Sequence, residues 1–202
     1  DVSRDPFAID ISASEKMRGL YLEAEKHDGY LRDKNVFGDE ITIEDSMSLL
    51  VKYRTGVVLN YSLNAYMPRE GFTVVFNGTE GRIEYQQVHE TGSATGQRGS
   101  QAINDLFWRN RLVVHPLFGE PYEVKLHTTT GGHGGSDPLL QEQIFSRTPP
   151  VDTLGRNAGH GQGAASVLIG VAANMSFETG TQVSIRDLCP AIGPASRLSE
   201  LP

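Results

Sequence analysis

Two alternating runs separated by a short turn constrain the fold of this chain more than any other feature. Apolar side chains occupy every second position over residues 47–53, and residues 57–63 repeat the pattern. Arg54-Thr55-Gly56 separates the runs, and glycine readily adopts the positive φ angles that tight turns need. Because successive side chains of a strand point to opposite faces, the pattern predicts an antiparallel hairpin with one apolar face.

The hairpin begins a longer β-rich block. Further strands are expected over residues 72–76, 82–85, 112–115 and 122–127. Several polar side chains of this block fall on one side of their strands, namely Asn60, Ser62, Asn64 and Thr73. We therefore expect an open, largely antiparallel β-sheet with helices packed on one face and its polar face available for contact.

Helical patterns flank the strands. Ser14 is expected to cap a helix that runs to about His27. Later in the chain, a helix is expected over residues 138–145, and a longer one over residues 161–179 that Gly180 stops. Helices on both sides of a run of strands indicate the α+β class.

The remaining segments complete a single-domain organisation. A short strand is expected over residues 183–185, followed by a loose tail over residues 190–202. Residues 88–104 are polar and rich in small side chains, which predicts a mobile excursion from the sheet. We expect residues 1–202 to form one α+β domain.

Charge and hydropathy exclude several classes of partner. The net charge of -7 over 202 residues argues against nucleic acid and anionic membrane surfaces, which reward basic patches. No apolar run approaches the roughly 18 residues of a membrane span. Cys189 is the single cysteine, which suits a reducing compartment, so we expect a cytoplasmic protein. Export of the parent stays open, because a leader would precede Asp1.

The glycine-rich stretch HTTTGGHGGSD, residues 127–137, is the strongest candidate site. Its glycines let the backbone approach a ligand closely, and it carries His133 and Asp137. Asp137 is expected to be the N-cap of the following helix, with Pro138 at the first helical position. The alternative is a surface connection whose histidine is only solvated.

Two further groups of polar side chains are candidate ligand contacts. Tyr30, Arg32 and Asp33 follow the first helix, and Tyr66 and Glu70 follow the hairpin. Surface charge is the usual explanation for such groups. Convergence of these groups from several edges of a sheet would suit a hydroxyl-rich ligand such as a sugar.

Other sites are disfavoured. Residues 159–164 match the dinucleotide fingerprint G-x-G-x-x-G/A, but no strand is expected before them, and the nearest acid after them, Glu178, belongs to the expected helix itself. His27-Asp28 and His133 with Asp137 lack a third metal ligand nearby. No G-x-S-x-G elbow exists to anchor a nucleophilic serine. We therefore expect no cofactor-binding and no metal-binding residues in this chain.

Taken together, these segments resemble a known enzyme family. HDGYLRDKNVF, the stretch from Ile41 to Tyr85, and GGHGGSDPLLQEQIF look like the C-terminal domain of Gfo/Idh/MocA oxidoreductases in their order and spacing. The resemblance covers residues 20–190. The glycine-rich loop is similar to one in NAD-dependent glycosidase members of that family.

The resemblance implies a two-domain parent enzyme, of which this chain is expected to be a C-terminal fragment. A Rossmann domain outside the chain would bind NAD or NADP, so the chain alone is expected to bind no cofactor and to be inactive. The family's catalytic lysine lies in a Lys-Pro dipeptide, which this sequence lacks. The sheet would cover the nicotinamide, line the substrate pocket, and form a homodimer or higher homo-oligomer.

The implied reaction is oxidation of a sugar or cyclitol hydroxyl, with hydride passing to nicotinamide. His133 is our candidate for the catalytic acid or base, and the expected substrate contacts are Asp137, Arg32, Asp33, Tyr30, Tyr66 and Glu70. Two alternatives stay open. One is an NAD-dependent, redox-neutral glycosidase or epimerase of the same family, and the other is a free-standing, non-catalytic module for carbohydrate binding or dimerisation.

Overall fold

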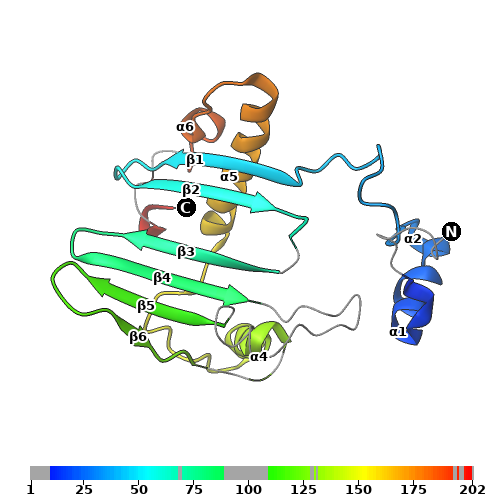
Figure 1. Cartoon of the computed structure of the whole chain (residues 1–202), viewed down its shortest axis with the longest axis horizontal. Coiled ribbons are helices and arrows are strands. Elements are labelled where there is room, and N and C mark those ends of the chain that lie inside the picture. The colour runs from blue at the N-terminus through cyan, green and yellow to red at the C-terminus, as the bar shows by residue number, and fades with distance from the viewer. Residues whose placement is uncertain are drawn as a thin grey trace. The chain divides into compact units, whose positions relative to one another are not determined.

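The computed structural model describes residues 10–67, 70–88, 109–127, 130, 132–192, 195 and 198–201. Its helices and antiparallel sheets confirm the α+β class (Figure 1). The chain divides into two compact units, Asp1–Asp45 with Ala65–Val124, and Ser46–Asn64 with Lys125–Pro202. The single domain expected from the sequence stays a prediction. The excursion expected over residues 88–104 lies outside the described residues, apart from Val88.

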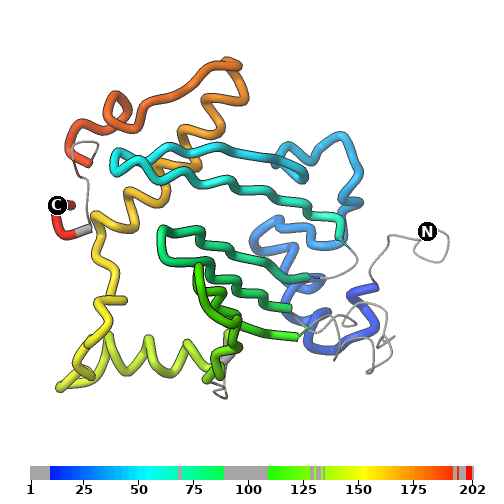
Figure 2. Tube along the Cα trace, turned by 60° about the vertical axis from the view of Figure 1, so that its left-hand side comes forward, coloured from blue at the N-terminus to red at the C-terminus, as the bar shows by residue number. Residues whose placement is uncertain are grey.

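The hairpin at residues 47–63 is confirmed. Strands β1 (Ser46–Lys52) and β2 (Val58–Asn64) pair antiparallel, from Ser46 opposite Asn64 to Lys52 opposite Val58. Figure 2 traces them as one cyan hairpin. Its turn closes where Tyr53 N–H donates to Val57 O at 2.8 Å and Gly56 adopts a φ of +91°.

The β1–β2 register sorts the hairpin into two faces. Partners in an antiparallel pair share a face, so the serines and asparagines gather on one side. That side carries Ser46, Ser48, Asn60, Ser62 and Asn64, together with Leu50, Lys52 and Val58. The opposite side carries Met47, Leu49, Val51, Leu59, Tyr61 and Leu63. The polar face expected from Asn60, Ser62 and Asn64 is therefore present on this hairpin.

The other unit contains an antiparallel meander of four strands in chain order. They are β3 (Gly71–Asn77), β4 (Gly81–Val88), β5 (Arg111–Pro116) and β6 (Tyr122–Val124). The expected strands are confirmed, although β4 is longer than the sequence suggested and β6 ends at Val124 rather than residue 127.

The strands are distributed over two sheets rather than one, because β2 and β3 do not pair. Ala65 N–H donates to Asp45 O at 2.7 Å, which closes the β1–β2 ladder at its end. The sheets are open and antiparallel, as expected, but Thr73 of β3 lies in a different unit from the polar residues of β2.

The four-stranded sheet is amphipathic in the same way. Its register places Thr73, Asn77, Arg82, Glu84, Arg111, His115 and Glu123 on one face, together with Val75 and Val113. Phe72, Val74, Phe76, Ile83, Tyr85, Leu112, Val114 and Tyr122 lie on the other. Much of the apolar face is exposed, with Phe76 at 62%. Among the described residues, buried apolar side chains are confined to Ile11 and Ala173.

The first helical segment is broken into short pieces. It comprises a 3₁₀ turn (η1, Ile11–Ala13), α1 (Glu15–Met17), a π turn (η2, Arg18–Leu22) and α2 (Glu25–Asp28). The cap at Ser14 is confirmed, since its Oγ accepts from Met17 N–H at 3.4 Å. The π turn interrupts the helix expected to run to His27: Glu23 N–H donates to Arg18 O at 2.9 Å, five residues back.

Four helical elements follow the sheets: α4 (Gly132–Phe145), α5 (His160–Thr179), α6 (Ile185–Leu188) and a 3₁₀ turn (η3, Leu198–Glu200). The long helix α5 is confirmed, and Gly180 ends it with a φ of +64°. The described helices include none long and apolar enough to span a membrane.

The strand expected over residues 183–185 is wrong. Ile185 begins α6, and Leu188 N–H donates to Ser184 O at 3.2 Å. A run of three residues is too short to distinguish a strand from a helical turn by its apolar pattern. In this case the local helical hydrogen bonds form instead of a strand pairing.

Candidate functional site

His133 and Asp137 form a close pair at the start of α4. Nδ1 of His133 lies 2.9 Å from both Oδ1 and Oδ2 of Asp137. An ionised carboxylate only accepts hydrogen bonds, so the proton of the neutral imidazole is assigned to Nδ1. Nε2 is then left as a hydrogen-bond acceptor, which is the arrangement of an imidazole general base.

The backbone of the glycine-rich loop makes this pair possible. His133 has a φ of +50° and Gly135 a φ of +89°, so the first turn of α4 departs from regular helix. Ser136 Oγ donates to His133 O at 2.8 Å and fixes the turn. Non-glycine residues with positive φ are uncommon and often mark functional positions.

Asp137 is not the N-cap that the sequence suggested, because α4 begins at Gly132. Its carboxylate bonds the ring of His133 rather than a backbone N–H of the helix. The side chain of His133 is 85% exposed and that of Asp137 44% exposed. The imidazole is thus oriented by a carboxylate while its surface stays open to a ligand.

Tyr30 and Arg32 lie around a third side chain, Tyr21, in the other unit. The guanidinium carbon of Arg32 is 4.5 Å from the centroid of the Tyr21 ring, and the Tyr21 and Tyr30 centroids are 6.2 Å apart. Tyr30 N–H donates to Asp28 Oδ1 at 2.9 Å. This cation–π cluster is an exposed platform of aromatic and cationic groups.

Tyr66 has a structural contact. Its hydroxyl donates to Val36 O at 3.0 Å, and its ring centroid lies 4.8 Å from that of Phe37. These contacts join the segment after β2 to the loop after α2, both within the unit formed by Asp1–Asp45 and Ala65–Val124. Asp33 and Glu70 are exposed. His133 and Asp137 belong to one unit and the other five predicted residues to the second, so their convergence on one ligand stays a prediction.

The polar face of the four-stranded sheet carries a charged cluster that the sequence reasoning missed. Arg82 Nε donates to Glu84 Oε1 at 2.6 Å, and Arg82 Nη1 donates to Asn77 Oδ1 at 2.9 Å. His115, directly opposite Arg82 on β5, has its Nε2 atom 4.0 Å from Glu84 Oε2. The alternation of Arg82 and Glu84 is visible in the sequence, but the nearness of His115 depends on strand register.

The arginines on this face lower the pKa values of the glutamates beside them. The hydrogen bond from Arg82 lowers the pKa of Glu84, helped by the charges of Arg82, His115 and Arg111 and opposed by desolvation. A second pair lies nearby, where Arg109 contacts Glu123 at 2.5 and 2.6 Å. That double hydrogen bond lowers the pKa of Glu123.

The residues that could hold a dinucleotide do not fit that role. Residues 151–159 contain no strand, so the glycines before α5 follow an irregular segment. Gly159 N–H donates to Gln162 Oε1 at 2.6 Å, which occupies a backbone donor at the N-terminus of α5. A dinucleotide fingerprint needs a strand leading directly into the glycine turn.

Within the described residues, no group of three or more His, Cys, Asp or Glu could hold a metal ion.

Comparison with known proteins finds one informative similarity. The chain is 36% identical over 141 residues to the protein named "Putative oxidoreductase YteT" from Bacillus subtilis (strain 168). The aligned part covers 70% of this chain and 31% of that relative, so the chain spans just under a third of the length of the curated relative it matches. No family model and no solved structure matches the chain.

Proposed function

We propose that this chain is the substrate-binding and oligomerisation domain of an NAD(P)-dependent oxidoreductase of the Gfo/Idh/MocA type. The similarity to a protein named an oxidoreductase supports the reaction class. The chain matches only 31% of that relative, which leaves ample length outside it for a cofactor-binding domain. The open antiparallel sheets suit a domain that covers a ligand held elsewhere.

The pair of His133 and Asp137 is the observation that carries this proposal. Oxidation of a carbinol removes a proton from the hydroxyl oxygen and a hydride from the carbon. Nε2 of His133 accepts the hydroxyl proton, and the carboxylate of Asp137 stabilises the imidazolium that forms. NAD or NADP, held by a part of the parent outside this chain, supplies the hydride acceptor.

The proposed substrate is a sugar or cyclitol. Tyr30 and Arg32 offer a hydroxyl and a guanidinium from one exposed cluster, to which Asp33 is adjacent in sequence. Tyr66 donates its own proton to Val36 O, so a ligand hydroxyl would donate to its oxygen. Glu70 adds an exposed carboxylate. A small number of such directional groups fixes the orientation of a hydroxyl-rich ligand.

The proposed oligomer is a homodimer, or a higher homo-oligomer, formed through the four-stranded sheet in the cytoplasm. The exposed aromatic side chains of Phe72, Phe76 and Tyr122 lie on its apolar face. Contiguous exposed apolar surface of this kind is typical of subunit interfaces.

The test uses the parent enzyme with a panel of sugars and cyclitols, and follows the reduced nicotinamide by absorbance. His133→Ala should lower turnover by about 10²- to 10⁴-fold while the affinity for NAD(P) stays near wild type. The isolated chain should show no NAD(P) binding by calorimetry. Unchanged turnover in His133→Ala would remove the basis of the proposal.

Two outcomes would favour the alternatives. Cleavage or epimerisation of a glycoside without net nicotinamide reduction would indicate the redox-neutral reaction. Sugar binding by a native protein that lacks any cofactor domain would indicate the non-catalytic module.

A further inference from the structure

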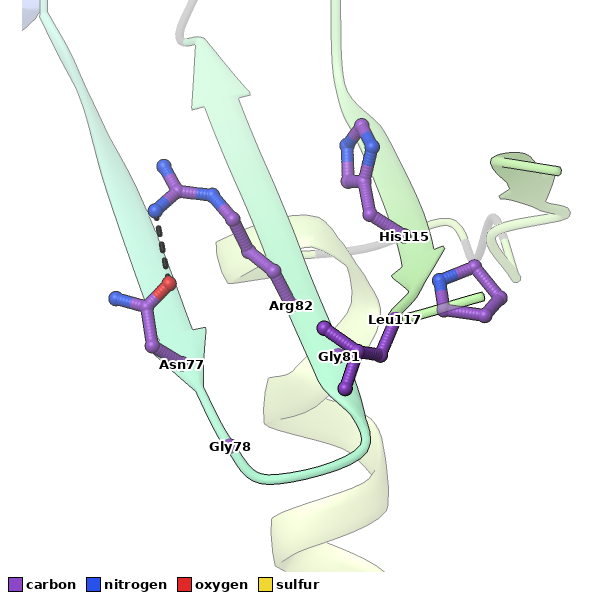
Figure 3. Close-up of a pocket in the computed structure, with 7 residues that line it drawn as sticks. Asn77, Gly78, Gly81, Arg82, His115 and Leu117 are labelled. Atoms are coloured by element: carbon purple, nitrogen blue, oxygen red, sulfur yellow. Dashed lines mark hydrogen bonds between the residues drawn. The ribbon is translucent and has the colours of Figure 1, made fainter. Parts of the chain in front are cut away.

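A groove opens on the polar face of the four-stranded sheet. This sheet belongs to the compact unit that does not contain His133. The groove has a volume of about 350 Å³. Its lining includes Asn77, Arg82 and His115 from three neighbouring strands, with Pro116 and Leu117 as apolar walls. Figure 3 shows Arg82 leaning from β4 toward Asn77 on β3, with His115 rising from β5.

Strand register fixes the positions of the three polar side chains. Asn77 is the partner of Arg82 across β3 and β4, and Arg82 is the partner of His115 across β4 and β5. Directly opposed residues share a face, with Cβ atoms only about 4.5–5.5 Å apart. Asn77 also accepts a hydrogen bond from Arg82 Nη1 at 2.9 Å. The guanidinium of Arg82 is thus held in place before any ligand binds.

His115 has an unmet hydrogen-bonding group at this groove. Its side chain is 38% exposed, yet the Nε2 atom itself is shielded from solvent and has no hydrogen-bond partner among the described residues. The nearest carboxylate oxygen, Glu84 Oε2, is 4.0 Å away, beyond hydrogen-bond distance. Shielded polar atoms without partners are rare in proteins, so a rotation of this ring that brings Nε2 to a ligand would satisfy an unmet hydrogen bond.

The local charge favours an anion. Among the described residues that line the groove, Arg82 carries a positive charge and none carries a carboxylate, while Glu84, whose pKa Arg82 lowers, is not part of the lining. This positively charged lining contrasts with the net charge of -7 of the chain. Arg82 donates from Nε to Glu84 and from Nη1 to Asn77.

We propose that this groove binds the oxyanion of a small molecule, either a carboxylate or a phosphate, between Arg82 and His115. Guanidinium groups pair with both anions through charge-assisted hydrogen bonds. In this conformation Nε2 of His115 is shielded, so the ring rotates to bring this nitrogen to the anion, and Nε2 then donates when it carries a proton. The groove volume of about 350 Å³ suits a small ligand.

The test is an NMR titration of the full chain that follows the ring resonances of His115 at constant pH. The probes are acetate for a carboxylate, inorganic phosphate for a phosphate, and acetamide as the neutral analogue of acetate. We expect a saturable shift with at least one anion and none with acetamide. Tighter binding of acetate identifies a carboxylate ligand, and tighter binding of phosphate identifies a phosphate ligand.

Two variants make the test specific. Arg82→Gln should weaken anion binding about tenfold or more, as expected for loss of a charge-assisted hydrogen bond. Arg109→Gln is the matched control, because Arg109 also pairs with a glutamate of this sheet but does not line the groove. It should change affinity by less than about twofold.

Arg82→Lys controls for a folding defect in Arg82→Gln. Lysine keeps the positive charge but lacks the planar guanidinium, so this variant should still bind the anion, more weakly than wild type. Absence of a saturable shift, an equal response to acetamide, or equal weakening by Arg109→Gln would overturn the proposal. None of these results bears on turnover of His133→Ala, so the two proposals fail independently.

Discussion

Asp137 holds the imidazole of His133 by Nδ1, with both carboxylate oxygens 2.9 Å from that nitrogen. The two residues are four positions apart on the first turns of α4. Their contact is therefore local and independent of any long-range pairing in the fold. A base that is oriented this way is preorganised before the substrate binds, which is a requirement for efficient proton transfer.

Asp137→Asn tests the orientation of the imidazole. The amide can donate to Nδ1, which would move the ring proton to Nε2 and remove the base. We expect turnover of the parent enzyme to fall about a hundredfold or more. Thermal unfolding should stay close to wild type, because the pair is exposed. Wild-type turnover in this variant would contradict the assignment of His133 as the base.

Arg109→Gln tests the ion pair between β5 and β6. Arg109 lowers the pKa of Glu123 from its ordinary 4.5. The stability that this pairing contributes is present above the ordinary pKa and is lost as the pH falls through the lowered, folded-state value. The variant should return the pKa of Glu123 toward 4.5 and flatten the acid limb of the unfolding curve.

The pKa of Glu123 can be followed by carbon NMR of its carboxyl group. The effect on stability should be small, because the two side chains are 51% and 43% exposed. An unchanged Glu123 pKa in Arg109→Gln would show that the double hydrogen bond is not populated in solution.

Gly81→Ala tests the turn between β3 and β4. Gly81 has a φ of +153°, and a Cβ there would lie 2.3 Å from His115 O on β5. We expect a loss of about 1–3 kcal/mol in the free energy of unfolding, since both the backbone and the β5 pairing must shift. Chemical denaturation would measure it.

Gly170→Ala in α5 is the matched control for Gly81→Ala. No heavy atom lies within 4 Å of a Cβ built at Gly170, and alanine favours helix over glycine by about 1 kcal/mol. This variant should be neutral or more stable. Equal destabilisation by both changes would argue against a specific steric role for Gly81.

Tyr66→Phe separates a structural role of this residue from a ligand contact. The change removes the hydroxyl that donates to Val36 O at 3.0 Å and should cost about 0.5–1.5 kcal/mol of stability. A raised KM for the sugar with unchanged kcat would show that the hydroxyl also contacts the substrate, as proposed. If the free energy of unfolding stays the same, the hydroxyl does not tether the loop.

The strands were predictable because their side chains alternate. Residues 47–63 encode apolar and polar faces directly, and the observed register from Ser46 to Asn64 follows from that alternation and the Gly56 turn. The division into two sheets was not predictable. Whether β2 pairs with β3 depends on long-range geometry, which local periodicity does not contain.

The residues of the candidate site could be predicted from the sequence better than their geometry. His133 and Asp137 were identified from a glycine-rich loop, yet the backbone turn with a φ of +50° at His133 changed the expected cap into a side-chain pair. His115 was missed because its sequence neighbours, Val114 and Pro116, suggest an ordinary strand. It meets Arg82 only through the β4–β5 register.

The assignment of side chains to the two faces of β3, β4 and β5 also limits where residues can be inserted or deleted. One residue inserted inside β4 would exchange Arg82 and Glu84 with Ile83 and Tyr85 between the two faces of the sheet. Insertions and deletions among natural relatives should therefore collect in the turns, at residues 54–56, 78–80 and 117–121, while the strand interiors keep a constant spacing.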